Sequence, residues 1–446
     1  MRYFIIILSS LIGLIAQASC QAASQTHEYN LSNGLKLLVK ENHRAPLAIS
    51  QIWYKVGSAY EPPGITGISH ALEHMMFKGT PSISGEQFNE IITQNGGELN
   101  AETGTDDTHY YELLAADKLA ISFKLEADRM QNLNLSAEDF AKEIQVVMEE
   151  RRLRTDDNPQ AFSYERLLAT AHIAAPYHHA PIGWMSDLEQ LTISDLKNWY
   201  HTWYAPNNAI LVVAGDVEPA KVYQLAEQYF GKIPAKTVPT LKKQPEPPAM
   251  GERSVTVRRP AKLPYLMLAY NVPSLVTTEK PWQPYALIVL AAALDADQSS
   301  RLAKNLIRAK RLAVGAGAHY DPYQRFSTLF TLTAIPAAEH GLEELETALL
   351  SEIEALQTVP LSATELAKIK SLLKANYIYA QDNLATQANF LGKLASLDLP
   401  WQEADTYLQN IQAVTAEQVK EVAKEYLITA RLTTAKLLPA KGQSHE

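Results

Sequence analysis

Apolar and polar residues alternate along two short runs that flank Asn33-Gly34, within residues 27–42. Alternation is the period of a half-buried strand, and Asn-Gly is a preferred hairpin turn, so this segment predicts a β-hairpin. The apolar-rich segment 47–57 predicts a third strand. The residues that follow, up to Gly67, are rich in Gly and Pro and predict a turn.

After this turn the period becomes helical. Apolar residues recur at Ile68, Leu72 and then Met75 or Met76, the spacing of an amphipathic helix. Ser136, with an acidic residue three positions later, resembles the capping box that opens a further helix. The elements expected before residue 232 are helices at 85–95, 116–130, 137–155 and 217–231, helical segments over 160–205, and strands at 100–114 and 209–217.

Residues 232–250 contain five prolines and little periodicity, so they predict a linker. The order of elements then repeats as strands, helices, paired strands and long helices. The expected elements are strands at 254–259 and 265–273, helices at 283–296 and 299–310, paired strands within 313–336, and helices at 339–357, 362–380 and 402–427. This repetition predicts an α+β fold of two homologous domains, 27–231 and 251–440, each a mostly antiparallel sheet covered by helices.

The helix after Gly67 contains the motif His70-Ala-Leu-Glu73-His74. Histidines four residues apart lie on one helix face, and their separation suits two ligands of a tetrahedral Zn²⁺. The Glu73 carboxylate can then reach a water molecule on the metal, as in the HxxEH motif. A helical His pair also occurs as a plain surface or core feature. The corresponding segment of the second half is the apolar ALIVLAAALDA, so one Zn²⁺ per chain is expected.

Composition and charge narrow the class of protein. The chain has 446 residues, of which 46% are hydrophobic and 20% charged, which is typical of a globular protein of two or more domains. A net charge of −9 gives no reason to expect a nucleic-acid partner.

Residues 1–22 resemble a secretory signal peptide, with Arg2, an apolar run and then small residues. The apolar run is too short for a stable membrane span. Cys20 is the only cysteine, which excludes an intramolecular disulfide and a thiolate zinc site. A lipid anchor on Cys20 would want a large aliphatic residue three positions earlier, where Gln17 stands, so a lipoprotein is disfavoured. We expect a secreted, periplasmic protein.

Several motifs together carry a family resemblance: SNGLKLLV, HALEHMMFKGT, GGELNAETGTDDTHYY, EIQVVMEERR, YAPNNAILVVAGDV and SSRLAKNLIRAKR. The chain resembles the short, two-domain bacterial members of the M16 family of zinc peptidases (pitrilysin, insulysin and mitochondrial processing peptidase). The resemblance implies that Glu150 is the third zinc ligand, with 75 residues between it and His74, and that Glu143 is a helper carboxylate. Glu73 is then the general base. A surface carboxylate is the alternative reading of Glu143.

The resemblance also implies a substrate-binding strand, for which Asn100 and Ala101 are the candidates, and an Arg and a Tyr supplied by the second domain. Arg308 matches that Arg, although it could equally be a plain surface residue. The chain departs from the family at the Tyr, where Val314 stands, and Tyr320 is out of register.

The expected function is a secreted zinc metalloendopeptidase that hydrolyses peptides or unfolded polypeptide segments. By resemblance the two halves are arranged as a clamshell, and the chain forms a homodimer or a heterodimer with a related chain. The alternative is a catalytically weak peptide-binding or assembly subunit that works with a partner chain. The loss of the Tyr favours this alternative, and the intact HxxEH motif opposes it.

Overall fold

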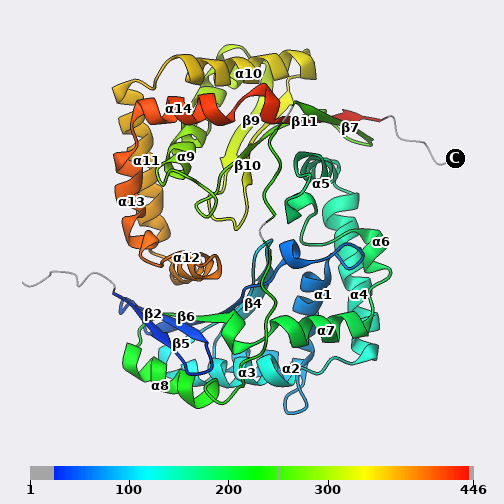
Figure 1. Ribbon diagram of the computed structural model, residues 1–446, viewed down its shortest axis with the longest axis vertical. Helices are drawn as coiled ribbons and strands as arrows, with labels where there is room; N and C mark the ends of the chain where they lie inside the picture. Colours follow the sequence, from blue (N-terminus) through cyan, green and yellow to red (C-terminus); the bar gives the residue numbers. More distant parts are fainter. Residues whose placement is uncertain (1–24, 243, 250, 441–446) are drawn as a thin grey trace, which may run out of the picture.

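The computed structural model describes residues 25–242, 244–249 and 251–440, and it contains two β-sheets covered by helices (Figure 1). The first sheet has the order β1-β2-β6-β3-β5-β4 and the second has the order β7-β11-β8-β10-β9. The strands of the first sheet are β1 (Thr26–Asn30), β2 (Lys36–Glu41), β3 (Leu47–Tyr54), β4 (Glu98–Thr103), β5 (Thr108–Ala115) and β6 (Ala209–Gly215). Those of the second are β7 (Arg253–Arg259), β8 (Tyr265–Val272), β9 (Ala313–Tyr320), β10 (Thr328–Pro336) and β11 (Leu432–Pro439).

The two sheets share one topology. In the first sheet β2 runs parallel to β6, and the pairs β6–β3, β3–β5 and β5–β4 are antiparallel. In the second, β7 runs parallel to β11, and the pairs β11–β8, β8–β10 and β10–β9 are antiparallel. The first sheet adds β1, which pairs with β2 as the predicted hairpin. This correspondence confirms the predicted α+β fold of two related halves with mostly antiparallel sheets.

The helices of the first half are α1 (Ile68–Met75), α2 (Gly85–Gln94), α3 (Leu119–Asn132), α4 (Ala137–Arg151), α5 (Pro159–Ala171), α6 (Met185–Leu188), α7 (Ile193–Trp203) and α8 (Pro219–Tyr229). Those of the second half are α9 (Gln283–Leu294), α10 (Leu342–Thr358), α11 (Ala363–Ala380), α12 (Leu384–Ser396), α13 (Glu403–Ala413) and α14 (Ala416–Tyr426). Helix α9 follows β8 as α1 follows β3. Most residues of α9 are buried, as its uniformly apolar sequence requires.

Two predictions about elements are wrong, and two elements were missed. Residues 100–114 form two strands, because Gly104 to Asp107 make a turn closed by the Gly104 N–H donating to the Asp107 carbonyl. The expected helix 402–427 is broken, because Thr415 caps a new helix through a reciprocal capping box with Gln418. Helix α12 and strand β11 were not expected. The predicted signal peptide at 1–22 lies outside the described residues, and the described helices include none long and apolar enough to cross a bilayer.

Each half covers part of the other half's sheet. Helix α12 packs on β3 and β6 of the first sheet, where Leu391 and Leu394 meet Trp53 in a buried cluster (Figure 1). Helix α5 packs on β7, β8 and β11 of the second sheet, where Leu167 and Ala171 enter a second buried cluster. Because these two apolar cores cross between the halves, the halves of one chain form a single packed unit.

The close contact at Gly392 gives a test of how tightly α12 packs on the first sheet. A Cβ atom at Gly392 would lie 2.2 Å from a ring carbon of Trp53, so α12 approaches the sheet too closely for any side chain there. Gly→Ala within a helix normally stabilises, but here overpacking should dominate. We expect Gly392→Ala to lower the free energy of unfolding by about 1–3 kcal/mol, measured by urea denaturation. Gly315→Ala, whose Cβ would meet its nearest atom at 3.9 Å, is the control and should change little.

Candidate metal centre

Helices α1 and α4 pack against each other and bring the three predicted ligands together. Nε2 of His74 lies 3.4 Å from Oε2 of Glu150, and Nε2 of His70 lies 3.8 Å from its Oε1. One ligand atom from each of the three residues lies within 4.8 Å of the others. Their side chains are between 12% and 19% exposed, so the three candidate donors are mostly buried but not fully shielded from solvent.

The donor set suits a zinc ion. Two imidazoles and one carboxylate are the ligands of many catalytic zinc sites, and they leave a further coordination position open. Burial, followed by the charges of His74 and Arg154, lowers the pKa of His70 to about 3. Its imidazole is therefore neutral at physiological pH, as metal coordination requires. The residues present thus fit the metal that the motif predicts.

A capping carboxylate holds the start of α1. Helix α1 begins after Gly67, which adopts φ +86° and has no side chain with which to cap the helix. The buried Glu61 caps the helix instead: its carboxylate accepts the Gly67 N–H at 2.7 Å and the Ser69 N–H at 2.8 Å. A carboxylate at a helix N-terminus also interacts favourably with the helix dipole. Because Ser69 precedes His70, Glu61 fixes the helix turn that carries the first ligand.

The preceding loop is held by a second carboxylate. Asp187 accepts hydrogen bonds from the Thr66 N–H and hydroxyl and from the Gly64 N–H. These donors lower the pKa of Asp187, although its partial burial opposes them. Neither Glu61 nor Asp187 was found by sequence reasoning, since each binds mainly backbone N–H groups and belongs to no motif.

Glu143 lies beside His74, as predicted for a helper carboxylate. Its Oε2 lies 3.4 Å from Nδ1 of His74, on the opposite side of the ring from the candidate ligand atom. Lys78 binds the other oxygen of Glu143 at 2.5 Å. This arrangement can fix the orientation of the His74 ring. By contrast, Nδ1 of His70 is buried and has no hydrogen-bond partner among the described residues.

Glu73 points toward strand β4. The Thr103 hydroxyl donates a hydrogen bond of 2.5 Å to Oε2 of Glu73. Burial raises the pKa of Glu73, and the Thr103 hydrogen bond partly offsets that effect. A raised pKa makes a carboxylate a stronger base, which favours proton transfer to it. Thr103 was missed by sequence reasoning, although it stands in the same GGELNAET segment as the predicted substrate residues.

Arg154 is a further contact that the sequence did not reveal. It binds Oε1 of Glu150 at 2.6 Å, while its own side chain is 75% exposed. Directly after Arg151, α4 widens into a π-helical turn, Arg152–Asp156, which carries Arg154. Such turns are frequent at functional sites. The adjacent Glu149 is 58% exposed and pairs with Arg152 instead, so the two neighbouring carboxylates differ clearly in environment.

The predicted substrate residues fall into two groups. Asn100 and Ala101 lie on β4, an edge strand of the first sheet, and β4 packs against α1. Arg308 lies exposed on the π-helix Leu302–Ala309 of the second half, and Val314 is 58% exposed on β9. Tyr320 is buried, and its hydroxyl donates to the Pro273 carbonyl at 2.6 Å, so it has a structural role. In the structure β4 therefore lies beside the candidate metal centre, whereas Arg308 lies in the second half.

Comparisons with known proteins identify relatives of this chain. Residues 36–181 match the family model described as insulinase (peptidase family M16), and residues 190–373 match that of the peptidase M16 inactive domain. The chain is 33% identical to the zinc protease PqqE of Helicobacter pylori, over 97% of this chain and 98% of the relative. It is 27% identical to an uncharacterized zinc protease of Rickettsia felis, over 92% and 96% of the two chains.

A solved structure shows the same fold. The crystal structure of a protease from Helicobacter pylori, 32% identical in sequence, superposes with a TM-score of 0.88 over 93% of this chain and all of the other. These relatives are named as zinc proteases or proteases, and they span almost the full length of both chains.

The cap on α1 predicts a pH effect on stability. Burial raises the pKa of Glu61 from 4.5 to about 7. An acid with a raised folded-state pKa stabilises the fold fully below pH 4.5, and this contribution is lost as the pH rises through 7. The Glu61→Gln variant stays neutral and does not lose this contribution. As the pH rises from 4.5 to 7, its free energy of unfolding should therefore increase by roughly 3 kcal/mol relative to that of the wild type. Urea denaturation across this range measures the difference.

The control is Glu149→Gln, which removes an exposed carboxylate from the same region. If the difference between Glu61→Gln and wild type were constant with pH, Glu61 would not titrate in this range.

Proposed function

The chain belongs to the M16 family of peptidases, and from this premise we propose that it is a zinc-dependent metalloendopeptidase that hydrolyses peptides or unfolded polypeptide segments. The single observation that supports this most strongly is the convergence of His70, His74 and Glu150 with Glu73 beside them. A structural His pair would not need a partly buried carboxylate from a second helix facing both rings.

In this proposal His70, His74 and Glu150 hold one Zn²⁺ per chain. A bound zinc ion supplies a Lewis acid that polarises the scissile carbonyl and lowers the pKa of a coordinated water. Glu73 accepts the proton of the attacking water and delivers it to the leaving amine. Its hydrogen bond from Thr103 orients the carboxylate for this exchange. Glu143 keeps the His74 ring in its ligating orientation through Nδ1.

Strand β4 is the proposed docking edge for substrate. It lies at the end of the first sheet and pairs with β5 on one side. An extended peptide can add to such an edge through main-chain hydrogen bonds, which makes recognition weakly dependent on sequence. Asn100 and Ala101 lie midway along this edge. This mode favours flexible or unfolded chains over folded proteins.

The proposal also covers Arg308 of the second half, a partner chain and the location of the protein. Arg308 stays a predicted substrate contact, and its exposure leaves it free to meet a peptide or a second chain. We propose that the protein pairs with an identical or related chain and that the leader at 1–22 directs it to the periplasm.

One observation supports a second candidate, a peptide-binding subunit of low activity. Val314 stands, exposed, where the resemblance implies a substrate-binding Tyr. A partner chain would then supply the missing contact.

The general base gives the first test. Glu73→Gln keeps the size of the side chain but cannot accept a proton, so cleavage of a quenched fluorescent peptide library should fall by at least about 10²-fold. Bound zinc, quantified by elemental analysis, should be the same in both proteins because Glu73 is not a ligand. Zinc in both with cleavage in neither would favour the peptide-binding subunit.

The two neighbouring carboxylates of α4 give a matched test of the ligand set. Glu150→Gln should lose most of its bound zinc, because an amide oxygen is a much weaker zinc ligand than a carboxylate. Glu149→Gln changes the adjacent side chain in the same way and should retain zinc, since Glu149 is exposed and paired with Arg152. Equal zinc in the two variants would show that Glu150 is not a ligand.

A further inference from the structure

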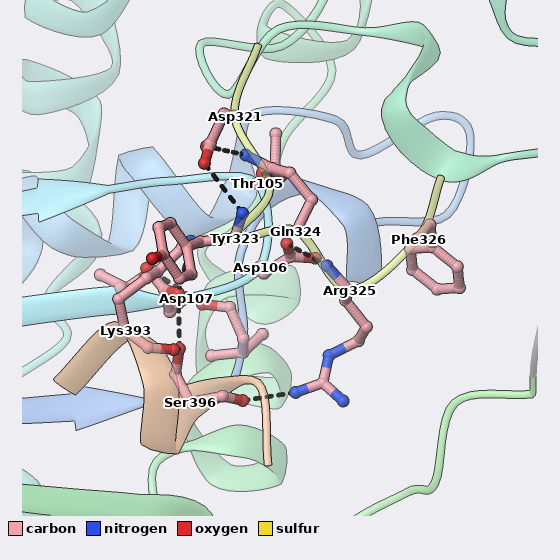
Figure 2. Close-up of polar contacts among 12 residues, drawn as sticks. Thr105, Asp106, Asp107, Asp321, Tyr323, Gln324, Arg325, Phe326, Lys393 and Ser396 are labelled. Carbon is pink, nitrogen blue, oxygen red and sulfur yellow. Dashed lines mark hydrogen bonds and ion pairs between the residues drawn. The ribbon is translucent and has the colours of Figure 1, made fainter. Parts of the chain in front are cut away.

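The turn between β4 and β5 is buried where the two halves meet. Residues 104–107 connect the proposed docking strand to its neighbour, and Figure 2 shows the side chains that surround them. Asp106 is fully buried and Asp107 is 4% exposed. Two carboxylates in a buried turn are costly unless they are paired or hydrogen-bonded. The partners of both therefore show what holds the turn.

Asp107 is bound by α12 of the second half. Lys393 forms an ion pair of 2.9 Å with Oδ2 of Asp107, and the Ser396 hydroxyl donates to the same oxygen at 2.8 Å (Figure 2). The side chains of Lys393 and Asp107 are 22% and 5% exposed. Asp107 also raises the pKa of Lys393, although burial opposes this. A pair this well buried is far less screened by salt than a surface pair.

Asp106 is bound by the loop between β9 and β10. The Arg325 N–H donates to Oδ2 of Asp106 at 3.0 Å, and the Tyr177 hydroxyl lies 2.7 Å and 2.9 Å from the two oxygens. The Phe326 N–H donates in turn to the Tyr177 hydroxyl. Thr105 donates to the side chain of Gln324 in the same loop. Every side chain of the turn thus contacts the second half, directly or through Tyr177.

The other side of the turn contacts the loop that leads to α1. The Ser58 and Ala59 N–H groups donate to the carbonyls of Gly104 and Thr105 at 3.2 Å and 2.8 Å. A Cβ atom at Gly57 would lie 2.5 Å from the Gly104 carbonyl oxygen, so the backbones meet without space for a side chain. The turn is therefore fixed between the second half and the segment that introduces the metal helix.

Thr103 links this turn to the site. It is the last residue of β4, it directly precedes Gly104, and its hydroxyl donates to Glu73. A shift of the turn would move Thr103 first and then the edge of β4. Displacement by about 1 Å at a site that must align reacting groups can cost up to 10²-fold in rate.

We propose that Lys393 and Asp107 are positioning residues, through which the second half holds the β4–β5 turn and so sets the placement of Thr103 and the β4 edge at the site. This inference rests on the proposed peptidase function for its kinetic consequence. Its structural consequence, an ordered β4 that depends on the ion pair, does not require activity. In this proposal the second half contributes no metal ligand, but it positions the strand that borders the site.

The test removes one charge of each sign, so the net charge around the turn stays the same, and Asp106 keeps its hydrogen bonds from the Arg325 N–H and the Tyr177 hydroxyl. The double variant Asp107→Asn with Lys393→Met is electrically neutral at both positions, unlike either single change. We expect kcat on the fluorescent peptide library to fall by about 10- to 100-fold. Zinc content should stay at the wild-type level, because no ligand contacts the pair. Hydrogen exchange should accelerate in peptides that cover residues 98–108 and stay unchanged in α10.

Two controls separate positioning from general destabilisation. Lys393→Arg retains the charge and should retain most of the activity. Asp297→Asn with Lys368→Met makes the same chemical changes at a more exposed Lys–Asp pair of the second half, whose nitrogen–oxygen distance is also 2.9 Å. This control should leave kcat and the hydrogen exchange of residues 98–108 unchanged.

The outcomes distinguish the two proposals. Unchanged exchange over residues 98–108 in the neutral double variant overturns the positioning role, whether or not the wild type cleaves peptides. Faster exchange there with wild-type kcat overturns the catalytic consequence. Failure of the wild type to cleave any peptide would overturn the proposed function, while faster exchange in the double variant would still support the structural role.

Discussion

Neither half of this chain can bury both faces of its own sheet, and most of the structure depends on that constraint. One face of each sheet packs on helices of the same half, and the other takes a single helix from the opposite half. The apolar residues on the second face would otherwise be exposed to water. Because α5 and α12 are exchanged in this way, the halves cannot separate without opening two cores. Their relative placement is therefore fixed well enough to align groups across the boundary.

This fixed boundary explains how a site built on one half can use the other. The candidate ligands all lie on α1 and α4, and the duplicated half has an apolar helix, α9, at the equivalent position. The second half contributes instead through α12 and the β9–β10 loop, which hold the turn after β4. Duplication has thus produced two similar sheets with different tasks. The first half carries the candidate ligands, and the second half contacts the turn at the end of the strand beside them.

The electrostatics of the site follow from burial. Helix α4 turns Glu143 and Glu150 toward the two histidines of α1, and each carboxylate also has a cationic partner, Lys78 or Arg154. A partly buried carboxylate without such partners would be costly. The same burial keeps His70 neutral and raises the pKa of Glu73. The candidate ligand His70 and the proposed proton acceptor Glu73, three residues apart, thereby differ in the direction of their pKa shifts.

The sequence by itself determined the features that depend on neighbours along the chain. Helical spacing placed His70, Glu73 and His74 on one face, alternation predicted the hairpin, and short apolar-rich runs predicted most of the other strands. The repeated order of elements predicted the duplication. The missed turn at 104–107 and the helix break at Thr415 also carry local signals, a Gly-Thr-Asp-Asp segment and a capping box.

Only the tertiary structure decided the contacts between distant segments. The pairing of Thr103 with Glu73, the cap that Glu61 places on α1 and the exchange of α5 and α12 leave no periodic trace in the sequence. The ion pair between Asp107 and Lys393 joins residues 286 positions apart. An isolated Asp or Lys is usually a solvated surface residue, and burial alone makes this pair significant. The tertiary structure determines which charged side chains are buried and desolvated, and burial makes their pairing matter for the fold.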